Sequence, residues 1–312
     1  DVNTHREARR WELARLSLTG KESRKYPLSQ EKGKAELVVT GFEFIDGLAQ
    51  DSRGNIYFCE HRMRRIYKLD ARSGQVTSIA DFPWNAVALA CDTQDNLIVV
   101  TKYISQPGYN NDDTRNGRPL FGWKGSGGLW GFNYVPKFYA IRPDNPDESF
   151  QVLPLVDMKQ FAAPQQIYYP GNRTITQSEY YNGRKPEQCF VAPDGVTIIP
   201  NYEDLFRCSS LVKAVPGKTV YTLDEYHQRV IHADVDAQGF LQNCRIFADG
   251  GDRSVVTDSK GNVYVANGDI SIFSPSGESI GTLEVPERPT SLLISGNKLY
   301  ITALSSLYQI EL

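Results

Sequence analysis

GNIYFCEHRMRRIYKLDARSGQV, residues 54–76, contains the unit from which the fold of this chain follows. Ile56 and Phe58 lie in a short strand pattern, a charged turn comes next, and a second apolar strand ends at the turn residues Ser73 and Gly74. Two short strands joined by a turn indicate a hairpin. Whether it occurs once or repeats decides the architecture.

The phrase GNIYF at the start of this segment has relatives along the whole chain. An apolar segment precedes each copy, a third strand follows it, and a fourth strand follows in most copies. The six copies are GNIYF (54–58), DNLIVV (95–100), PGNRTITQ (170–177), PGKTVYTL (216–223), GNVYVAN (261–267) and GNKLYITA (296–303). Units of four short strands that repeat roughly every 40 residues are typical of β-propeller blades.

The strands in the middle of the chain are assigned by the same rule. We expect the second unit to end with FQVLPLV (150–156) and the fourth to begin with SLVKAV (210–215). In the third unit, QQIYY (165–169) is the expected first strand, and EQCFVAP (187–193) and GVTIIPN (195–201) are the expected third and fourth strands.

The last unit lacks a fourth strand, because the chain stops at Leu312. AELVVTG, residues 35–41, has no partner of its own and could complete that blade, which would leave no open sheet edge. The sequence therefore predicts an all-β fold, a six-bladed β-propeller over residues 35–312 closed by an N-terminal strand. Residues 1–34 are an extension, in which THREARRWELARLSL forms either a short helix packed on the propeller or part of a linker from an upstream domain.

Composition narrows the class of partner. The 312 residues include 34 Lys and Arg and 37 Asp and Glu, a net charge of −3, without a long run of like charge. We therefore expect no nucleic acid partner, and no membrane span, since no apolar stretch approaches about 20 residues. The start at Asp1 suggests a secreted or periplasmic protein or an upstream domain, with a cytoplasmic one left open. The odd number of cysteines, five, without metal-ligand spacing favours buried free thiols.

The second unit carries a long insertion, because the interval from Asn96 to Asn172 is nearly twice the others. The insertion, residues 103–136, is expected to overhang the mouth of the central channel as a lid. Its aromatic residues, among them Tyr103 and Trp130, indicate packed order. Flat apolar faces among polar side chains suit a small-molecule or glycan ligand, although Trp130 could instead belong to the core of the lid.

Several blade phrases resemble a known family. The segments GLAQDSRGNIYFCE, PGKTVYTLDEYHQRVIHADVDAQG and SVVTDSKGNVYVANGDISIFSPSGESIGTLEVPERPTSLLISGNKLYITALSSLYQIEL look like the gluconolactonase, regucalcin and senescence-marker-protein family. The resemblance covers about residues 40–312 and is clearest over the last hundred. It implies a six-bladed propeller and, for its characterised enzymes, calcium-dependent lactonase or related ester hydrolase activity.

The same resemblance implies a divalent ion on the propeller axis, with ligands from blades one, four and five. Blade one gives Asp46 where the family has Glu, and blade four gives Ser209 where it has Asn. Blade five gives Arg253, or Asp252 if the spacing slips by one, and blade three gives the AAPQQ segment with Gln166. Two alternatives follow. Either Asp46 and Asp252 hold Ca²⁺, which polarises a lactone carbonyl and activates water, or Arg253 forms an ion pair with Asp46 in place of the metal.

Loops after the second strands supply other candidates for chemistry. His61 and His227 lie in equivalent hairpin loops, and Glu225 is close to His227 in sequence. These three are the predicted catalytic residues, because imidazole and carboxylate groups serve as general acids and bases, with ordinary solvated turns as the alternative. The predicted substrate-binding residues are Tyr103, Trp130, Gln166, Tyr180, Ser209 and Arg253.

Two classes of function remain open. One is a carbohydrate-related hydrolase, which opens a lactone if metal is bound, or acts as a metal-independent glycan hydrolase or lyase. The other is a non-catalytic propeller that binds a glycan or a protein, as one module of a larger secreted chain. Clustering of the His, Glu and Arg candidates around one pocket would favour the enzyme.

Overall fold

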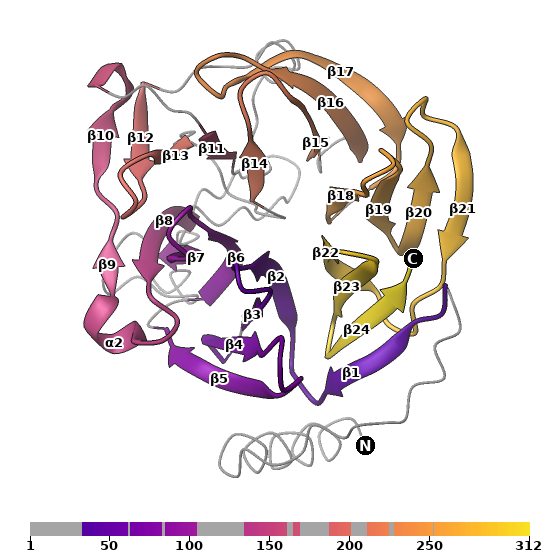
Figure 1. The fold of residues 1–312 in the computed structure, drawn as a ribbon, viewed down its shortest axis with the longest axis horizontal. Coiled ribbons are helices and arrows are strands. Elements are labelled where there is room, and N and C mark those ends of the chain that lie inside the picture. Colours follow the sequence, from indigo (N-terminus) through magenta and orange to yellow (C-terminus); the bar gives the residue numbers. More distant parts are fainter. Residues whose placement is uncertain are drawn as a thin grey trace, which may run out of the picture.

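Six β-sheets are arranged around a central axis as the blades of a ring (Figure 1). The computed structural model describes residues 33–61, 63–82, 85–104, 134–160, 165–168, 187–200, 211–224, 228–251 and 253–312. The predicted all-β, six-bladed propeller is confirmed. Inner strands of neighbouring sheets contact one another near the centre, as β2 and β22 do.

Blades one, two and five are antiparallel sheets whose strands follow chain order from the axis outward. Blade one is β2 (Ile45–Gln50), β3 (Ile56–Glu60), β4 (Arg65–Leu69) and β5 (Val76–Asp81). Blade two is β6 (Asn85–Cys91), β7 (Leu97–Ile104), β8 (Tyr134–Ile141) and β9 (Gln151–Val152). Blade five is β18 (Val255–Thr257), β19 (Val263–Asn267), β20 (Asp269–Phe273) and β21 (Ser279–Leu283).

Blade six combines strands from the two ends of the described chain. It consists of β22 (Pro289–Ser295), β23 (Lys298–Ala303), β24 (Ser306–Glu311) and β1 (Glu36–Thr40). β1 is antiparallel to β24, with Glu36 opposite Gln309 and Thr40 opposite Ser306. The pairing covers the outer edge of β24 with backbone hydrogen bonds.

Blades three and four differ from the predicted strand order. The third sheet has the order β10 (Leu155–Asp157), β12 (Gln188–Val191), β13 (Thr197–Pro200), β11 (Gln165–Tyr168) and β14 (Val212–Ala214). Blade four contains β15 (Thr219–Asp224), β16 (Arg229–Val235) and β17 (Leu241–Asp249).

The prediction that GVTIIPN supplies the fourth strand of blade three was wrong. Its strand β13 lies between β12 and β11, and β11 runs parallel to it. FQVLPLV was expected to serve blade two alone, but Pro154 separates β9, on β8, from β10, on β12. SLVKAV contributes β14 to β11 rather than to β15. Proline cannot donate a ladder hydrogen bond, which explains the break between β9 and β10.

Helical structure is minor in the part of the chain that the structure describes. It consists of α2 (Pro146–Ser149) and a single 3₁₀ turn, Met158–Gln160. No helix among these residues has the length and apolarity to cross a membrane. The helix predicted within residues 1–34 and most of the predicted lid, residues 103–136, lie outside the described residues.

An aspartate organises the same turn in several blades. Asp51 accepts hydrogen bonds from the backbone N–H of Asn55, at 2.9 Å, and from its side-chain amide, at 2.8 Å. Asp92 with Asn96 and Asp258 with Asn262 repeat both contacts. The carboxylate satisfies donors that the chain reversal leaves unpaired, so the repeated Asp and Asn hold each turn closed.

These turns also connect neighbouring blades. The Ser52 hydroxyl of blade one donates to Asp95 of blade two at 2.5 Å, and the Thr93 hydroxyl of blade two donates to Asp194 at 2.6 Å. Asp194 lies in the turn between β12 and β13. This turn therefore takes the position in blade three that the Asp51 and Asp92 turns take in blades one and two, which is a second departure from the predicted order.

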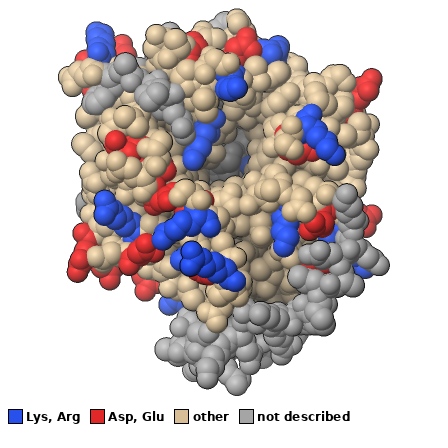
Figure 2. Space-filling model, in the orientation of Figure 1, with Lys and Arg blue, Asp and Glu red and all other residues tan. Residues whose placement is uncertain are grey.

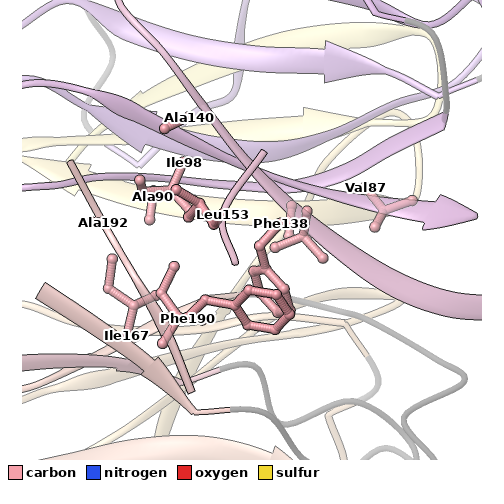
Figure 3. Close-up of a cluster of buried hydrophobic side chains, with 12 residues drawn as sticks. Val87, Ala90, Ile98, Phe138, Ala140, Leu153, Ile167, Phe190 and Ala192 are labelled. Atoms are coloured by element: carbon pink, nitrogen blue, oxygen red, sulfur yellow. The ribbon is translucent and has the colours of Figure 1, made fainter. Parts of the chain in front are cut away.

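The hydrophobic core lies mainly between blades. Figure 3 shows the cluster between blades two and three, where Phe138 and Phe190 lie 4.4 Å apart between ring centroids. Ile98 of blade two and Ile167 of blade three are fully buried in the same cluster. Because the apolar faces of a sheet are buried by its neighbours, each blade depends on adjacent blades for stability.

The cysteines are free thiols in the described residues. Cys59, Cys91 and Cys189 are buried, as predicted, and Cys244 is half-buried. Burial raises the pKa of Cys91 to about 12 and that of Cys244 to about 11. Protonated thiols are poor nucleophiles, so these residues serve packing.

A β-bulge at Gly47 shapes the inner strand of blade one. The register of β2 on β3 shifts between Asp46 and Ala49. Gly47 has φ 61°, and a Cβ there would lie 3.1 Å from the Cα of Ala88 and 3.2 Å from the Cys59 Sγ. Glycine therefore permits both the left-handed backbone and the close approach of blade two.

We expect Gly47→Ala to lower the free energy of unfolding by about 2–4 kcal/mol, because backbone strain adds to overpacking against Ala88. The control is Gly74→Ala, at φ 67° with nothing within 4 Å, which carries the backbone cost alone, about 1–2 kcal/mol. Urea unfolding of both variants measures the difference. Equal losses would show that blade two does not crowd Gly47.

We expect Asp51→Asn to destabilise the protein by about 1–3 kcal/mol at neutral pH. Burial opposes ionisation of Asp51, but hydrogen bonds from Asn55 and Tyr57 outweigh it and lower its pKa. The native carboxylate therefore contributes stability above about pH 4, the unfolded pKa, and loses it as pH falls through the lower native pKa.

In urea unfolding at each pH, the stability difference between wild type and Asp51→Asn should then stay constant from about pH 7 to about pH 5 and narrow as pH falls below about 4. Asp81→Asn is the matched control, because the Asp81 side chain is 79% exposed and its ion pair with Arg65 is solvated. If the stability difference between wild type and Asp51→Asn stayed constant down to about pH 3, the ionised Asp51 carboxylate would not be the stabilising group.

Candidate functional site

Asp46 begins the site at the start of the inner strand β2. Its side chain is 5% exposed, and its Oδ1 accepts the backbone N–H of Gly47 at 2.8 Å. The Cys59 thiol donates to the backbone carbonyl of Asp46 at 3.2 Å. The bulge at Gly47 and the strand β3 thus fix the position of a buried carboxylate near the axis.

Arg253 reaches Asp46 from blade five. Its Nη2 donates to the Asp46 Oδ2 at 2.9 Å, and its side chain is 28% exposed. Arg253 lies two residues before β18, and blade six, with β22, lies between β18 and β2 in the ring (Figure 1). A side chain can span from blade five to blade one only where the inner strands converge. The ion pair therefore lies near the axis, as the alternative without metal predicted.

A phenylalanine that the sequence analysis did not single out connects this pair to His61. The Arg253 guanidinium lies 5.8 Å from the centroid of the Phe44 ring, within the range of cation–π attraction. The His61 ring packs edge-on against Phe44 at 6.1 Å, and the His61 backbone N–H donates to the Phe44 carbonyl at 3.0 Å. Asp46, Arg253 and His61, three of the predicted site residues, are thus brought into one cluster.

Glu60 is a second residue that the predicted site omitted. It is 1% exposed at the end of β3, and it accepts the Glu43 N–H at 2.7 Å and the Tyr67 hydroxyl at 3.2 Å. Burial raises the pKa of Glu60, against the lowering effect of these hydrogen bonds. The sequence signal was its place directly before His61, at the end of a strand.

Hydroxyl groups tie together the inner strands that carry the site. The Leu48 N–H of blade one donates to the Ser291 Oγ of blade six at 3.1 Å, and the Leu292 N–H donates to the Ser254 Oγ of blade five at 3.1 Å. The Thr290 hydroxyl donates to the Ile45 carbonyl at 2.7 Å. These bonds hold blades five, six and one in fixed relation, so Arg253 and Asp46 are pre-positioned.

A space-filling view shows a hollow at the centre of the ring (Figure 2). Positive and negative side chains are mixed around it, without a continuous patch of one sign on this face. Mixed charge of this kind does not favour a polyanion.

The described residues do not fit the calcium site that the family resemblance implies. Both oxygens of Asp46 accept hydrogen bonds, and a guanidinium already lies 2.9 Å from one of them. A cation bound to that oxygen would face the positive charge of Arg253. No group of three or more His, Cys, Asp or Glu side chains suited to a metal occurs among the residues with described positions. Asp252, the second predicted ligand, lies outside them.

The other predicted residues are placed as follows. Gln166 is fully buried on β11, and its side-chain amide donates to the Gln238 carbonyl of blade four. This contact gives Gln166 a packing role, and substrate binding by it stays a prediction. Tyr103 lies in β7, and no side-chain contact is described for it. The remaining predicted residues fall outside the described chain: Trp130, Tyr180, Ser209, Glu225 and His227.

We expect Arg253→Ala to lower the free energy of unfolding by about 1–3 kcal/mol, because the buried Asp46 carboxylate loses its cation. Arg245→Ala removes a guanidinium whose side chain is 47% exposed, beside the 44% exposed Asp234, and should cost about 0–1 kcal/mol. Chemical denaturation of the two variants gives the comparison. Equal, small losses would mean that Asp46 does not depend on Arg253.

Comparisons with known proteins agree with this fold. A sequence model of the SMP-30/Gluconolactonase/LRE-like region matches residues 214–305, which span most of blades four to six. A comparison with curated proteins found no match.

Solved structures with the same fold include enzymes and a binding protein. A candidate gluconolactonase is 14% identical, with TM-score 0.55, 89% of this chain and 91% of that chain covered. A luciferin-regenerating enzyme is 12% identical, with TM-score 0.54, 88% and 94% covered. An auxiliary nutrient binding protein from Bacteroides thetaiotaomicron is 9% identical, with TM-score 0.53, 88% and 71% covered. At these identities the likeness establishes the fold alone. The chain is therefore a six-bladed propeller in which residues 214–305 are similar to the SMP-30/Gluconolactonase/LRE-like region.

Proposed function

We propose that this protein is a hydrolase of the gluconolactonase-like propeller type, which opens a lactone or cleaves a related sugar ester near the propeller axis. The observation that carries the proposal is the cluster of Asp46, Arg253, Phe44 and His61. The family match supports the hydrolase class, and the cluster supplies groups for acyl chemistry without a step through a metal.

Arg253 is the group that would stabilise charge. A guanidinium has five N–H donors, and one of them is used on Asp46 among the contacts of the described residues. Its 28% exposure leaves it accessible to a ligand. Hydrogen bonds from Arg253 to a carbonyl oxygen would strengthen as negative charge develops there, which lowers the barrier to attack.

His61 is the group that would move a proton. An imidazole can take a proton from water near neutral pH, so that the hydroxide attacks the carbonyl carbon. The ring C–O bond of the lactone then breaks, and the leaving oxygen takes a proton to give the hydroxy acid. Phe44, between His61 and Arg253, would pack against the apolar face of a sugar-sized substrate.

A non-catalytic binding module is the second candidate. Asp46 and Arg253 neutralise each other, so the pair can hold a ligand through hydrogen bonds without any turnover. The two candidates differ in one result, because a binder retains ligand unchanged whereas a hydrolase releases product. The further catalytic candidates Glu225 and His227 stay predictions and belong in the same test.

The experiment is a screen of sugar lactones and aryl esters with the whole chain, followed by variants on any substrate that is turned over. We expect His61→Ala to lower kcat by about 10²–10⁴-fold. His232→Ala is the control, because His232 in β16 stacks on Tyr221 and contacts Arg245, away from the cluster. Full activity in both Asp46→Ala and His61→Ala would show that the site is elsewhere. Ligand binding without product would favour the binding module.

A further inference from the structure

We propose that Arg253 takes the place of a divalent cation in this site, and that the site therefore binds a carboxylate group of a sugar-acid ligand without metal. The inference deepens the proposed function and rests on it for the location of the ligand. The class of ligand follows from the chemistry of the Arg253 guanidinium, which is held against the buried Asp46 carboxylate.

The first step is that the position of Arg253 is fixed. The Ser254 Oγ, next to it in the chain, accepts the Leu292 N–H at 3.1 Å, and the Ser254 carbonyl accepts the Ala266 N–H at 2.9 Å. Ser254 is 2% exposed. The backbone that carries Arg253 is therefore anchored to blades five and six, and the guanidinium is not a mobile surface group.

The second step is that Asp46 is saturated as a ligand. Gly47 N–H occupies its Oδ1 and Arg253 Nη2 occupies its Oδ2. A calcium ion needs six to eight oxygen ligands, and it would have to displace a bound guanidinium of like charge to reach this carboxylate. A fixed cation that already pairs with the carboxylate removes the electrostatic reason for binding the ion.

The third step is that Arg253 still has donors to offer. Its Nη2 hydrogen bond to Asp46 uses one of the five N–H donors of the guanidinium, and its side chain is 28% exposed. The planar fork of the guanidinium matches a carboxylate in a bidentate arrangement. The Arg253 guanidinium lies 5.8 Å from the centroid of the Phe44 ring. The ring face attracts the positive charge and keeps water from that side of it.

The charges of Asp46 and Arg253 limit the charge that a ligand can carry. Asp46 neutralises Arg253, and its carboxylate repels each negative charge that a ligand brings close, so a ligand with one negative charge is held better than one with two. A carboxylate carries one negative charge, whereas a phosphate carries close to two near neutral pH. The hydroxyl and ring faces of a sugar acid would then lie toward Phe44 and His61.

The test uses the whole chain after dialysis against a chelator, with calorimetry and thermal melting. The probes are D-glucuronate, neutral D-glucose, inorganic phosphate and calcium chloride. We expect D-glucuronate to bind and raise Tm, with affinity unchanged by EDTA and reduced by salt, and at least 10-fold weaker binding for glucose and phosphate. Calcium chloride should leave Tm unchanged.

Variants separate recognition by Arg253 from general effects. Arg253→Gln should weaken D-glucuronate binding at least 10-fold, and Arg253→Lys should weaken it less, because charge remains while the planar fork is lost. Arg53→Gln, which alters an exposed arginine beside Asp144, should bind as wild type does. If Arg253→Gln does not fold, Arg253→Lys and the salt dependence of the wild type still decide the question.

Two results would overturn the inference. One is a rise of wild-type Tm with calcium that Asp46→Ala abolishes, since the ion would then have displaced Arg253. The other is equal binding of glucuronate and glucose, or unchanged binding in Arg253→Gln.

Hydrolysis is measured separately. Carboxylate binding without turnover of any substrate would leave this inference standing and refute the hydrolase. Turnover of sugar lactones by the wild type, together with unchanged D-glucuronate binding in Arg253→Gln, would refute the inference and leave the hydrolase standing.

Discussion

The structure depends on the burial of each sheet between its neighbours. A four-stranded blade is too small to cover its own apolar faces, and the buried clusters accordingly draw on adjacent blades, as Phe138 and Phe190 do across blades two and three. Because every blade is needed by the next, the ring has to be complete. β1 pairs with β24, so both ends of the described chain lie in one sheet. Separating these two strands would break their backbone hydrogen bonds and expose the edge of β24.

Convergence of the inner strands follows from this ring, and it explains why the candidate site lies at the axis. Asp46 and Arg253 are 207 positions apart in the chain, yet Asp46 Oδ2 and Arg253 Nη2 lie 2.9 Å apart, because the start of β2 and the segment just before β18 meet at the same centre. The hydroxyls of Ser254, Thr290 and Ser291 fill the positions between these strands. The polar residues near the axis thus form one connected group in which the carboxylate and the guanidinium define each other's position.

The identity of the charged residue on blade five changes the chemistry that the same scaffold can support. Oxygen ligands around an open centre suit a hard cation, whereas a guanidinium bonded to the buried carboxylate supplies a fixed positive charge with directional donors. The match to the family model covers residues 214–305, which include Arg253, so this match does not by itself settle which of the two is present. The residues at the axis carry the functional argument, and the propeller supplies only their positions.

The sequence by itself determined the repeat, the blade number and the turn chemistry. Strand alternation and the Asp and Asn turns are local properties, with donors and acceptors within four residues of each other, as at Asp51 and Asn55. The family resemblance, with positions counted from the repeats, placed Asp46 and Arg253 among the candidates, and His61 was a candidate from its hairpin loop. Tertiary structure alone decided the order of β10 to β14, the role of Phe44 and the choice of partner for Asp46. These outcomes depend on which distant segments meet when the ring closes, and such contacts leave no periodic pattern along the chain.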